Sequence, residues 1–159
     1  MATAYPLPDQ KKIEEILGLL FDGLEVKTGG SFDQTPAGGA WFGVFVSDGG
    51  ATVALCGADA NLAASMGAAL SMLPPNIAKE AAKAKKLTDV MEENIREVMN
   101  ICTRLVMDGG AAHLRLDKCF ETKSLPQPAA KLLTGAAGRR EFQLQLPKYG
   151  GGVLSLIST

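Results

Sequence analysis

Apolar residues recur at helical spacing in three stretches of the chain. The first, residues 10–21, follows Asp9, and the second, residues 60–73, follows Asp59; an aspartate there can accept a hydrogen bond from an unpaired N–H of the first turn. The third and longest stretch spans residues 88–107. Residues that end helices follow the three stretches, namely Gly23, the pair Pro74-Pro75 and the triplet Asp108-Gly109-Gly110. The pattern therefore predicts three helices.

Short apolar runs bounded by turn residues predict β-strands. Residues 41–47 (WFGVFVS) and 51–57 (ATVALCG) are joined by the turn residues 48–50, which indicates a β-hairpin. We expect further strands at residues 111–123, 140–146 and 152–158, and a short helix or turn at residues 127–135. The stretch at residues 74–86 is basic and alanine-rich, and its run at residues 78–86 is interpreted as a solvated helix end and connector. These elements predict an α+β fold with a largely antiparallel sheet packed against long amphipathic helices, in a single domain over residues 1–159.

The long helix divides into an apolar half and a polar half. At 100° per residue, the apolar half that must face the core contains Met91, Ile95, Val98, Met99, Ile101, Cys102, Leu105 and Val106. Glu93, Glu97, Asn100 and Arg104 fall together on the opposite half, because their spacings of four, three and four return to one face. This polar stripe faces either water alone or a partner. Asn94 falls within the apolar half and needs a buried hydrogen-bond partner.

The composition narrows the classes of function. With 16 basic and 17 acidic residues and a pI near 5.8, the chain lacks the positive field that nucleic acid or an anionic membrane surface attracts. No stretch approaches the roughly 18 apolar residues of a membrane-spanning helix, and the first residues lack the pattern of a signal peptide. We therefore expect a cytoplasmic protein without a nucleic-acid or membrane partner.

The cysteines and the histidine are expected to be structural. Cys56, Cys102 and Cys119 are far apart and have apolar neighbours, which favours buried thiols. A zinc site requires cysteines close to histidines, but His113 is the only histidine and lies in an expected strand. We expect no metal bound by this chain.

Glu97-x-x-Asn100, in the middle of a long amphipathic helix, resembles the phosphatase motif of the CheC/CheX family of bacterial chemotaxis proteins. The hairpin and "ATVALCGADANLAASMGAALSML" before the motif are similar to the family's strand and helix. After the motif, "SLPQPAAKLL" and "REFQLQLPKYGGGVLSLIS" are similar to its proline-containing connection and terminal hairpin. The resemblance covers residues 10–158. One Glu-x-x-Asn motif is present, which is similar to a single-site, CheX-like arrangement.

The resemblance implies a CheX-like phosphatase that accelerates hydrolysis of the phosphoaspartate on a CheY-type response regulator, in chemotaxis or two-component signalling. By this resemblance, Glu97 and Asn100 are the catalytic residues. The Asn100 amide would hold a water in line with the breaking P–O bond, and Glu97 would pair with the active-site lysine of the regulator. The Mg²⁺ ion would be supplied by the regulator, so the chain itself would bind no cofactor.

Two positions depart from the family pattern. Glu93 stands where the family usually has Asp or Ser, and Arg104 stands where it usually has Gly. Both are interpreted as partner-binding residues, although Arg104 could instead hydrogen-bond to Asn100 and inactivate the site. The alternatives are therefore a non-catalytic CheX-like module that binds a regulator or another signalling partner, and an unrelated α+β protein. A homodimer formed through strand edges or helix faces is a further possibility.

Overall fold

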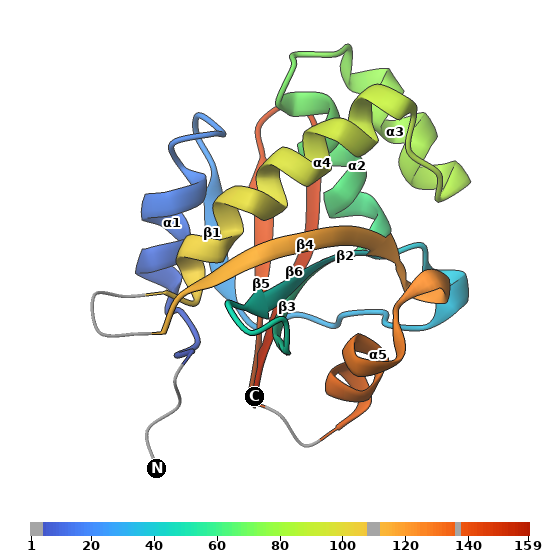
Figure 1. Cartoon of the computed structure of the whole chain (residues 1–159). Helices are drawn as coiled ribbons and strands as arrows, with labels where there is room; N and C mark the ends of the chain where they lie inside the picture. The colour runs from blue at the N-terminus through green and yellow to red at the C-terminus, as the bar shows by residue number, and fades with distance from the viewer. Residues whose placement is uncertain (1–4, 108–111, 136–137) are drawn as a thin grey trace.

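A computed structural model describes residues 5–107, 112–135 and 138–159 of the chain (Figure 1). Within these residues the strands form a six-stranded sheet in the order β1-β5-β6-β3-β2-β4, with every neighbouring pair antiparallel. The strands are β1 (Glu25–Thr28), β2 (Trp41–Ser47), β3 (Thr52–Ala58), β4 (Leu114–Glu121), β5 (Gly138–Leu146) and β6 (Gly150–Ser158). The α-helices are α1 (Gln10–Leu17), α2 (Ala60–Ala69), α3 (Pro75–Ala84), α4 (Asp89–Cys102) and α5 (Gln127–Thr134). The α+β class with an antiparallel sheet is confirmed.

Helices cover the two faces of the sheet unequally (Figure 1). On one face, the buried residues of α1, α2 and α4 share the main core with Phe45 of β2, Phe142 of β5 and Leu154 of β6. On the other face, α5 contributes Ala129 and Leu133 to a smaller core. No helix of the described chain is long and apolar enough to cross a bilayer.

The predicted hairpin is confirmed as β2 and β3, two inner strands of the sheet. All six residues from Trp41 to Val46 are buried, without the alternation of a half-exposed strand, because cores lie on both faces. The turn is closed by the Ser47 N–H, which donates to the Ala51 carbonyl at 2.9 Å, and by the Gly50 N–H, which donates to the Ser47 carbonyl at 2.9 Å.

Both predicted helix caps are confirmed. Asp9 Oδ1 accepts from the Lys12 N–H at 2.9 Å, and Asp59 Oδ1 accepts from the Leu62 N–H at 2.9 Å. The second oxygen of Asp59 accepts from the Val153 N–H at 3.0 Å, which links the start of α2 to β6. Burial raises the pKa of Asp59, while these two N–H donors oppose the shift by stabilising the carboxylate.

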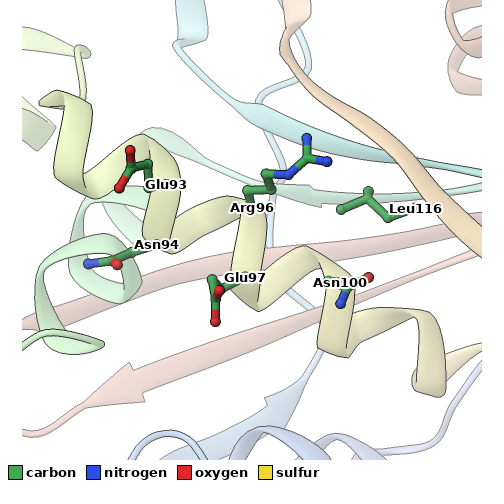
Figure 2. A pocket seen from close by; sticks show the side chains of 6 residues that line it. All are labelled: Glu93, Asn94, Arg96, Glu97, Asn100 and Leu116. Carbon is green, nitrogen blue, oxygen red and sulfur yellow. The ribbon is translucent and has the colours of Figure 1, made fainter.

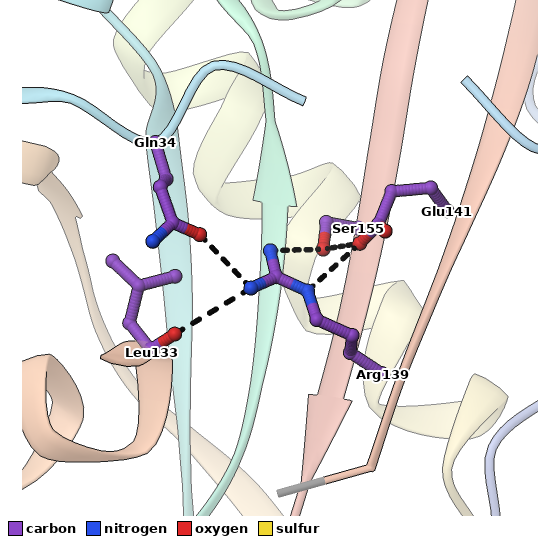
Figure 3. A network of polar contacts seen from close by, with 5 residues as sticks. All are labelled: Gln34, Leu133, Arg139, Glu141 and Ser155. Atoms are coloured by element: carbon purple, nitrogen blue, oxygen red, sulfur yellow. Dashed lines mark hydrogen bonds and ion pairs between the residues drawn. The ribbon is translucent and has the colours of Figure 1, made fainter. Parts of the chain in front are cut away.

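A polar network lies on the face of the sheet that α5 covers (Figure 3). The Arg139 guanidinium donates to Glu141 at 3.1 Å, to Gln34 at 2.9 Å and to the Ser155 hydroxyl at 3.3 Å. It also reaches the Leu133 carbonyl at 3.5 Å, and Ser155 donates to Glu141 at 2.5 Å. Because Ser155 is fully buried, these contacts satisfy its hydroxyl and tie α5 to β5 and β6.

The first helix is shorter than predicted. The sequence pattern favours a helix ending near Gly23, but α1 ends at Leu17, where the Gly18 N–H donates to the Glu14 carbonyl. Glycine disfavours helix propagation, and the chain continues in turns that still bury Phe21 in the core. Apolar spacing alone therefore overestimates the helix, since residues in a turn can reach the same core.

Residues 78–86 were predicted as a helix end and connector, but the helical part is longer than expected, because residues 78–84 belong to α3. Pro75 occupies the first helical position. A backbone N–H at this position has no acceptor within the helix, so proline loses no hydrogen bond there. Ala78 and Ala81 are buried one turn apart, whereas Lys79 and Lys83 are exposed. Small buried residues allow α3 to lie close to α2. In the sequence, however, alanines give only a weak apolar pattern, so the full helix was not predicted.

Two details near the sheet edges also differ from the prediction. The sequence gives no signal for β1, whose only buried residue is Val26. His113 was expected inside a strand, but β4 begins at Leu114 and the His113 side chain is 63% exposed. Its Nδ1 lies 2.6 Å from Asp48 Oδ1, so the ring links the β2–β3 turn to the start of β4.

The thiols are buried to different degrees. Cys56 and Cys102 are fully buried, as predicted, but Cys119 on β4 is only half-buried. Burial raises the pKa of Cys119 to about 11. The prediction of three buried thiols is therefore confirmed for two of them.

Candidate functional site

The predicted apolar half of the long helix faces the core. Thr88 caps α4 by accepting from the Met91 N–H at 3.3 Å, and Asp89 and Glu92 in the first turn complement the helix dipole. The buried residues of α4 are Met91, Ile95, Val98, Met99 and Cys102. Leu105 and Val106 beyond the helix are also buried, and Ile101 is half-buried. The rotation of α4 about its axis therefore agrees with the helical wheel.

Two glycines let α4 approach the rest of the fold closely. A Cβ atom at Gly43 of β2 would lie 2.8 Å from the Cβ of Met99, and one at Gly67 of α2 would lie 3.0 Å from the Cβ of Met91. A side chain at either glycine would push α4 outward. Gly43 thus sets the height of α4 above the sheet, and Gly67 sets the separation of α4 from α2.

Asn94 has the partners that its position requires. Its Nδ2 donates to the Gly67 carbonyl at 2.8 Å and to the Ser71 hydroxyl at 2.8 Å. Gly67 lies in the last turn of α2, where backbone carbonyls lack helical donors. Asn94 therefore anchors α4 to the end of α2 on one side of the polar face.

The polar face of α4 borders an open depression of about 450 Å³ (Figure 2). Glu93, Glu97 and Asn100 are exposed and line this depression together with Asn94, Arg96 and Leu116. Leu116 comes from β4, which runs beside α4 (Figure 1). The structure therefore brings Glu93, Glu97 and Asn100 together on one accessible surface, as the spacing predicts.

The side chains of Glu97 and Asn100 are exposed on the surface of α4. Among residues 5–107, 112–135 and 138–159, no hydrogen bond or ion pair engages the side chain of either residue. The carboxylate offers acceptors only, whereas the amide offers both an acceptor and two donors. No group of three or more His, Cys, Asp or Glu side chains within the described chain could hold a metal ion.

Arg104 lies beyond the end of α4. The α-helix ends at Cys102, five residues before the predicted end at Met107, and tightens into a 3₁₀ turn over Thr103–Leu105. Each residue of a 3₁₀ turn rotates further around the axis than a residue of an α-helix. Arg104 is exposed but does not line the depression, and within the part of the chain that the structure describes it makes no hydrogen bond to Asn100. The predicted end signal at residues 108–110 lies outside the described residues.

The 3₁₀ turn instead fixes the backbone at Asn100. The Thr103 hydroxyl donates to the Asn100 carbonyl at 2.8 Å, and the Thr103 N–H also donates to this carbonyl. The last turn of α4 is therefore closed directly below the amide side chain. This contact stiffens the position from which the Asn100 side chain extends.

Three residues that line the depression, Asn94, Arg96 and Leu116, were not predicted as site residues from the sequence. Arg96 lies four residues before Asn100, so its helical spacing could have identified it. Leu116 lies on β4, and only the three-dimensional pairing of β4 with β2 brings it beside α4. Nothing in the sequence pattern of β4 signals that contact.

The comparisons with known proteins find similar structures but no similar sequences. No protein-family model and no curated protein matches the chain. FliY of Thermotoga maritima has a TM-score of 0.56 at 9% identity, over 94% of this chain and 81% of that chain. The FliM middle domain of H. pylori has a TM-score of 0.49 at 11% identity, over 94% and 82%. A chain of the CheX-CheY-BeF₃-Mg²⁺ complex of Borrelia burgdorferi has a TM-score of 0.44 at 15% identity, over 93% and 90%. At this identity, the likeness to FliY is one of fold alone.

Proposed function

We propose that this chain is a phosphatase that accelerates hydrolysis of the phosphoaspartate on a CheY-type response regulator. The observation that carries the proposal is the exposure of Glu97 and Asn100 together on the outer face of α4, beside an open depression. The Glu-x-x-Asn motif supports it, because this motif resembles that of the CheC/CheX family. The fold shared with FliY is compatible with the proposal.

Asn100 is proposed to position the attacking water. Its Oδ1 accepts a hydrogen bond from the water, so that the water oxygen lies in line with phosphorus and the bond to the aspartyl oxygen. Attack forms the new P–O bond as the aspartyl P–O bond breaks, which yields the aspartate carboxylate and inorganic phosphate. A neutral amide suits this role because a carboxylate would repel the phosphoryl oxygens.

Glu97 is proposed to anchor the helix on the regulator. Its carboxylate, one turn before Asn100, would form a charge-assisted hydrogen bond with the active-site lysine of the regulator. Glu93 lies one turn before Glu97 and extends the same acidic surface. The regulator holds the Mg²⁺ ion, which neutralises phosphoryl charge when bound.

The test is phosphate release from a panel of phosphorylated CheY-type regulators with Mg²⁺. The wild-type chain should accelerate release from at least one regulator. Asn100→Ala should lower the acceleration by on the order of 100-fold while leaving affinity nearly unchanged, because the amide positions water rather than holding the partner. Glu97→Ala should weaken binding itself. Thermal unfolding of each variant checks that the fold is retained.

The outcomes separate the alternatives. Binding that depends on Glu97 without faster phosphate release would favour a non-catalytic module that recognises a regulator. Absence of both binding and acceleration with every regulator would overturn the proposed function. If wild type and Asn100→Ala accelerated phosphate release equally, the role proposed for the Asn100 amide would be wrong.

A further inference from the structure

Arg96 is a cation at the site to which neither the sequence motif nor the proposed mechanism gives a role. Its side chain is exposed and lines the same depression as Glu97 and Asn100. Figure 2 shows it extending from α4 toward Leu116 of β4, whereas Glu97 points away from that strand. The guanidinium therefore lies on the β4 side of the depression.

Within the described chain, Arg96 forms no ion pair with the glutamates that precede it on α4. Glu92 and Glu93 precede it by four and three residues, which are the usual spacings of an intrahelical ion pair. The ion pairs of the described residues nevertheless join His113 to Asp48, Lys123 to Glu121 and Arg139 to Glu141, and none involves Arg96. Its positive charge acts on Cys119 of β4. The charge lowers the pKa of this thiol, whereas burial has the larger effect and raises it.

The position of Arg96 relative to Asn100 indicates which group Arg96 can bind. A separation of four residues puts the two side chains on the same side of α4, about one turn apart. An anion that reaches the Asn100 amide from the β4 side therefore meets the guanidinium. Glu93 and Glu97 make the rest of the depression acidic and would repel such an anion without a nearby cation.

We infer that Arg96 binds an oxygen of the phosphoryl group on the docked regulator and so makes docking depend on phosphorylation. The inference rests on the proposed function. A planar guanidinium suits phosphate oxygens, because its N–H groups donate in a fixed fork. Asn100 acts on the water and Glu97 on the lysine of the partner, so Arg96 supplies the one contact of this chain to the group that is removed.

The experiment compares the affinity of the chain for a regulator with Mg²⁺ alone and with Mg²⁺ plus beryllium fluoride, a phosphoryl mimic. The wild-type chain should prefer the beryllium fluoride form. Arg96→Gln should reduce this preference about tenfold, the effect expected on losing one charge-assisted hydrogen bond, while affinity for the unmodified regulator is retained. Arg96→Lys should keep part of the preference, because it keeps the charge but not the fork.

Lys131→Gln is the control, since it removes an exposed cation of α5, which packs against the opposite face of the sheet and does not line the depression. It should leave the preference unchanged. A further arm replaces beryllium fluoride with inorganic phosphate, which should not raise the affinity. If phosphate raised it as much as the mimic, the assignment to a protein-bound phosphoryl group would be wrong.

The result separates this inference from the proposed function. If the wild-type chain accelerates phosphate release but Arg96→Gln keeps the full preference for the mimic, the inference alone is overturned. If the wild-type chain neither binds nor acts on any regulator, the proposed function and the inference are overturned together.

Discussion

The Asn94 side chain donates a hydrogen bond to the Gly67 carbonyl at 2.8 Å and thereby completes the last turn of α2. In this turn, the carbonyls of Met66, Ala68 and Ala69 accept from backbone N–H groups that follow the helix. The Gly67 carbonyl instead accepts a hydrogen bond from the Asn94 side chain of the neighbouring helix α4. One amide thus caps the end of α2 and links it to α4, which carries the candidate site.

Asn94→Ala should lower the free energy of unfolding by about 1–2 kcal/mol, because the carbonyl of the buried Gly67 loses its side-chain donor. Urea unfolding measures the change. Asn100→Ala is the matched control on the same helix: its side chain is exposed, and its removal should change stability by less than about 0.5 kcal/mol. Equal losses in the two variants would contradict the anchoring role of Asn94.

Gly43→Ala should destabilise the fold by about 1–3 kcal/mol, since the new methyl group would lie 2.8 Å from the Met99 Cβ and α4 must move outward. Gly49→Ala is the control, because its nearest contact would be the Ser47 hydroxyl oxygen at 3.9 Å. Urea unfolding of both variants gives the comparison. If the Gly43 variant were as stable as the Gly49 variant, the glycine would not set the height of α4.

The rotation of α4 was predictable because it follows from local chemistry. Its apolar spacing selects the buried face, and the need of Asn94 for a partner is evident once the wheel is drawn. The caps at Asp9 and Asp59 were predictable for the same reason, since each interaction spans three residues. Interactions between residues a few positions apart can therefore be predicted from the sequence.

The remaining features depend on contacts between distant segments. The full extent of α3 was missed because its buried residues are alanines, whose contribution depends on how closely α2 approaches. The shape of the depression depends on Leu116, which reaches α4 only through the pairing of β4 with β2. The early end of α4, which places Arg104 beyond the helix, was missed because helical periodicity does not reveal where a helix tightens.

Arg104→Gly tests whether the departure from the family pattern matters. Because Arg104 does not line the depression, we expect the variant to release phosphate from the regulator within about twofold of the wild-type rate. Glycine should lower stability by roughly 1 kcal/mol in this 3₁₀ turn, so Arg104→Ala serves as a second variant without that backbone effect. A large rate increase in both variants would show that Arg104 restrains Asn100.

The reactivity of Cys119 provides a probe of the β4 side of the depression that does not require a partner. Burial raises the pKa of its thiol to about 11, so only about 0.1% is thiolate at pH 8. Alkylation by iodoacetamide, followed by mass spectrometry of the Cys119 peptide, should accelerate about tenfold per pH unit below that pKa.

The same measurement reports on Arg96. The guanidinium lowers the pKa of Cys119, so Arg96→Gln should raise that pKa further and slow alkylation at a fixed pH. Arg104→Gln should leave the rate unchanged, and Cys56 and Cys102 should react only when the protein unfolds, because both are fully buried. Unchanged alkylation of Cys119 in Arg96→Gln would mean that the guanidinium does not lie over β4, and the geometry assigned to the phosphoryl contact would then be wrong.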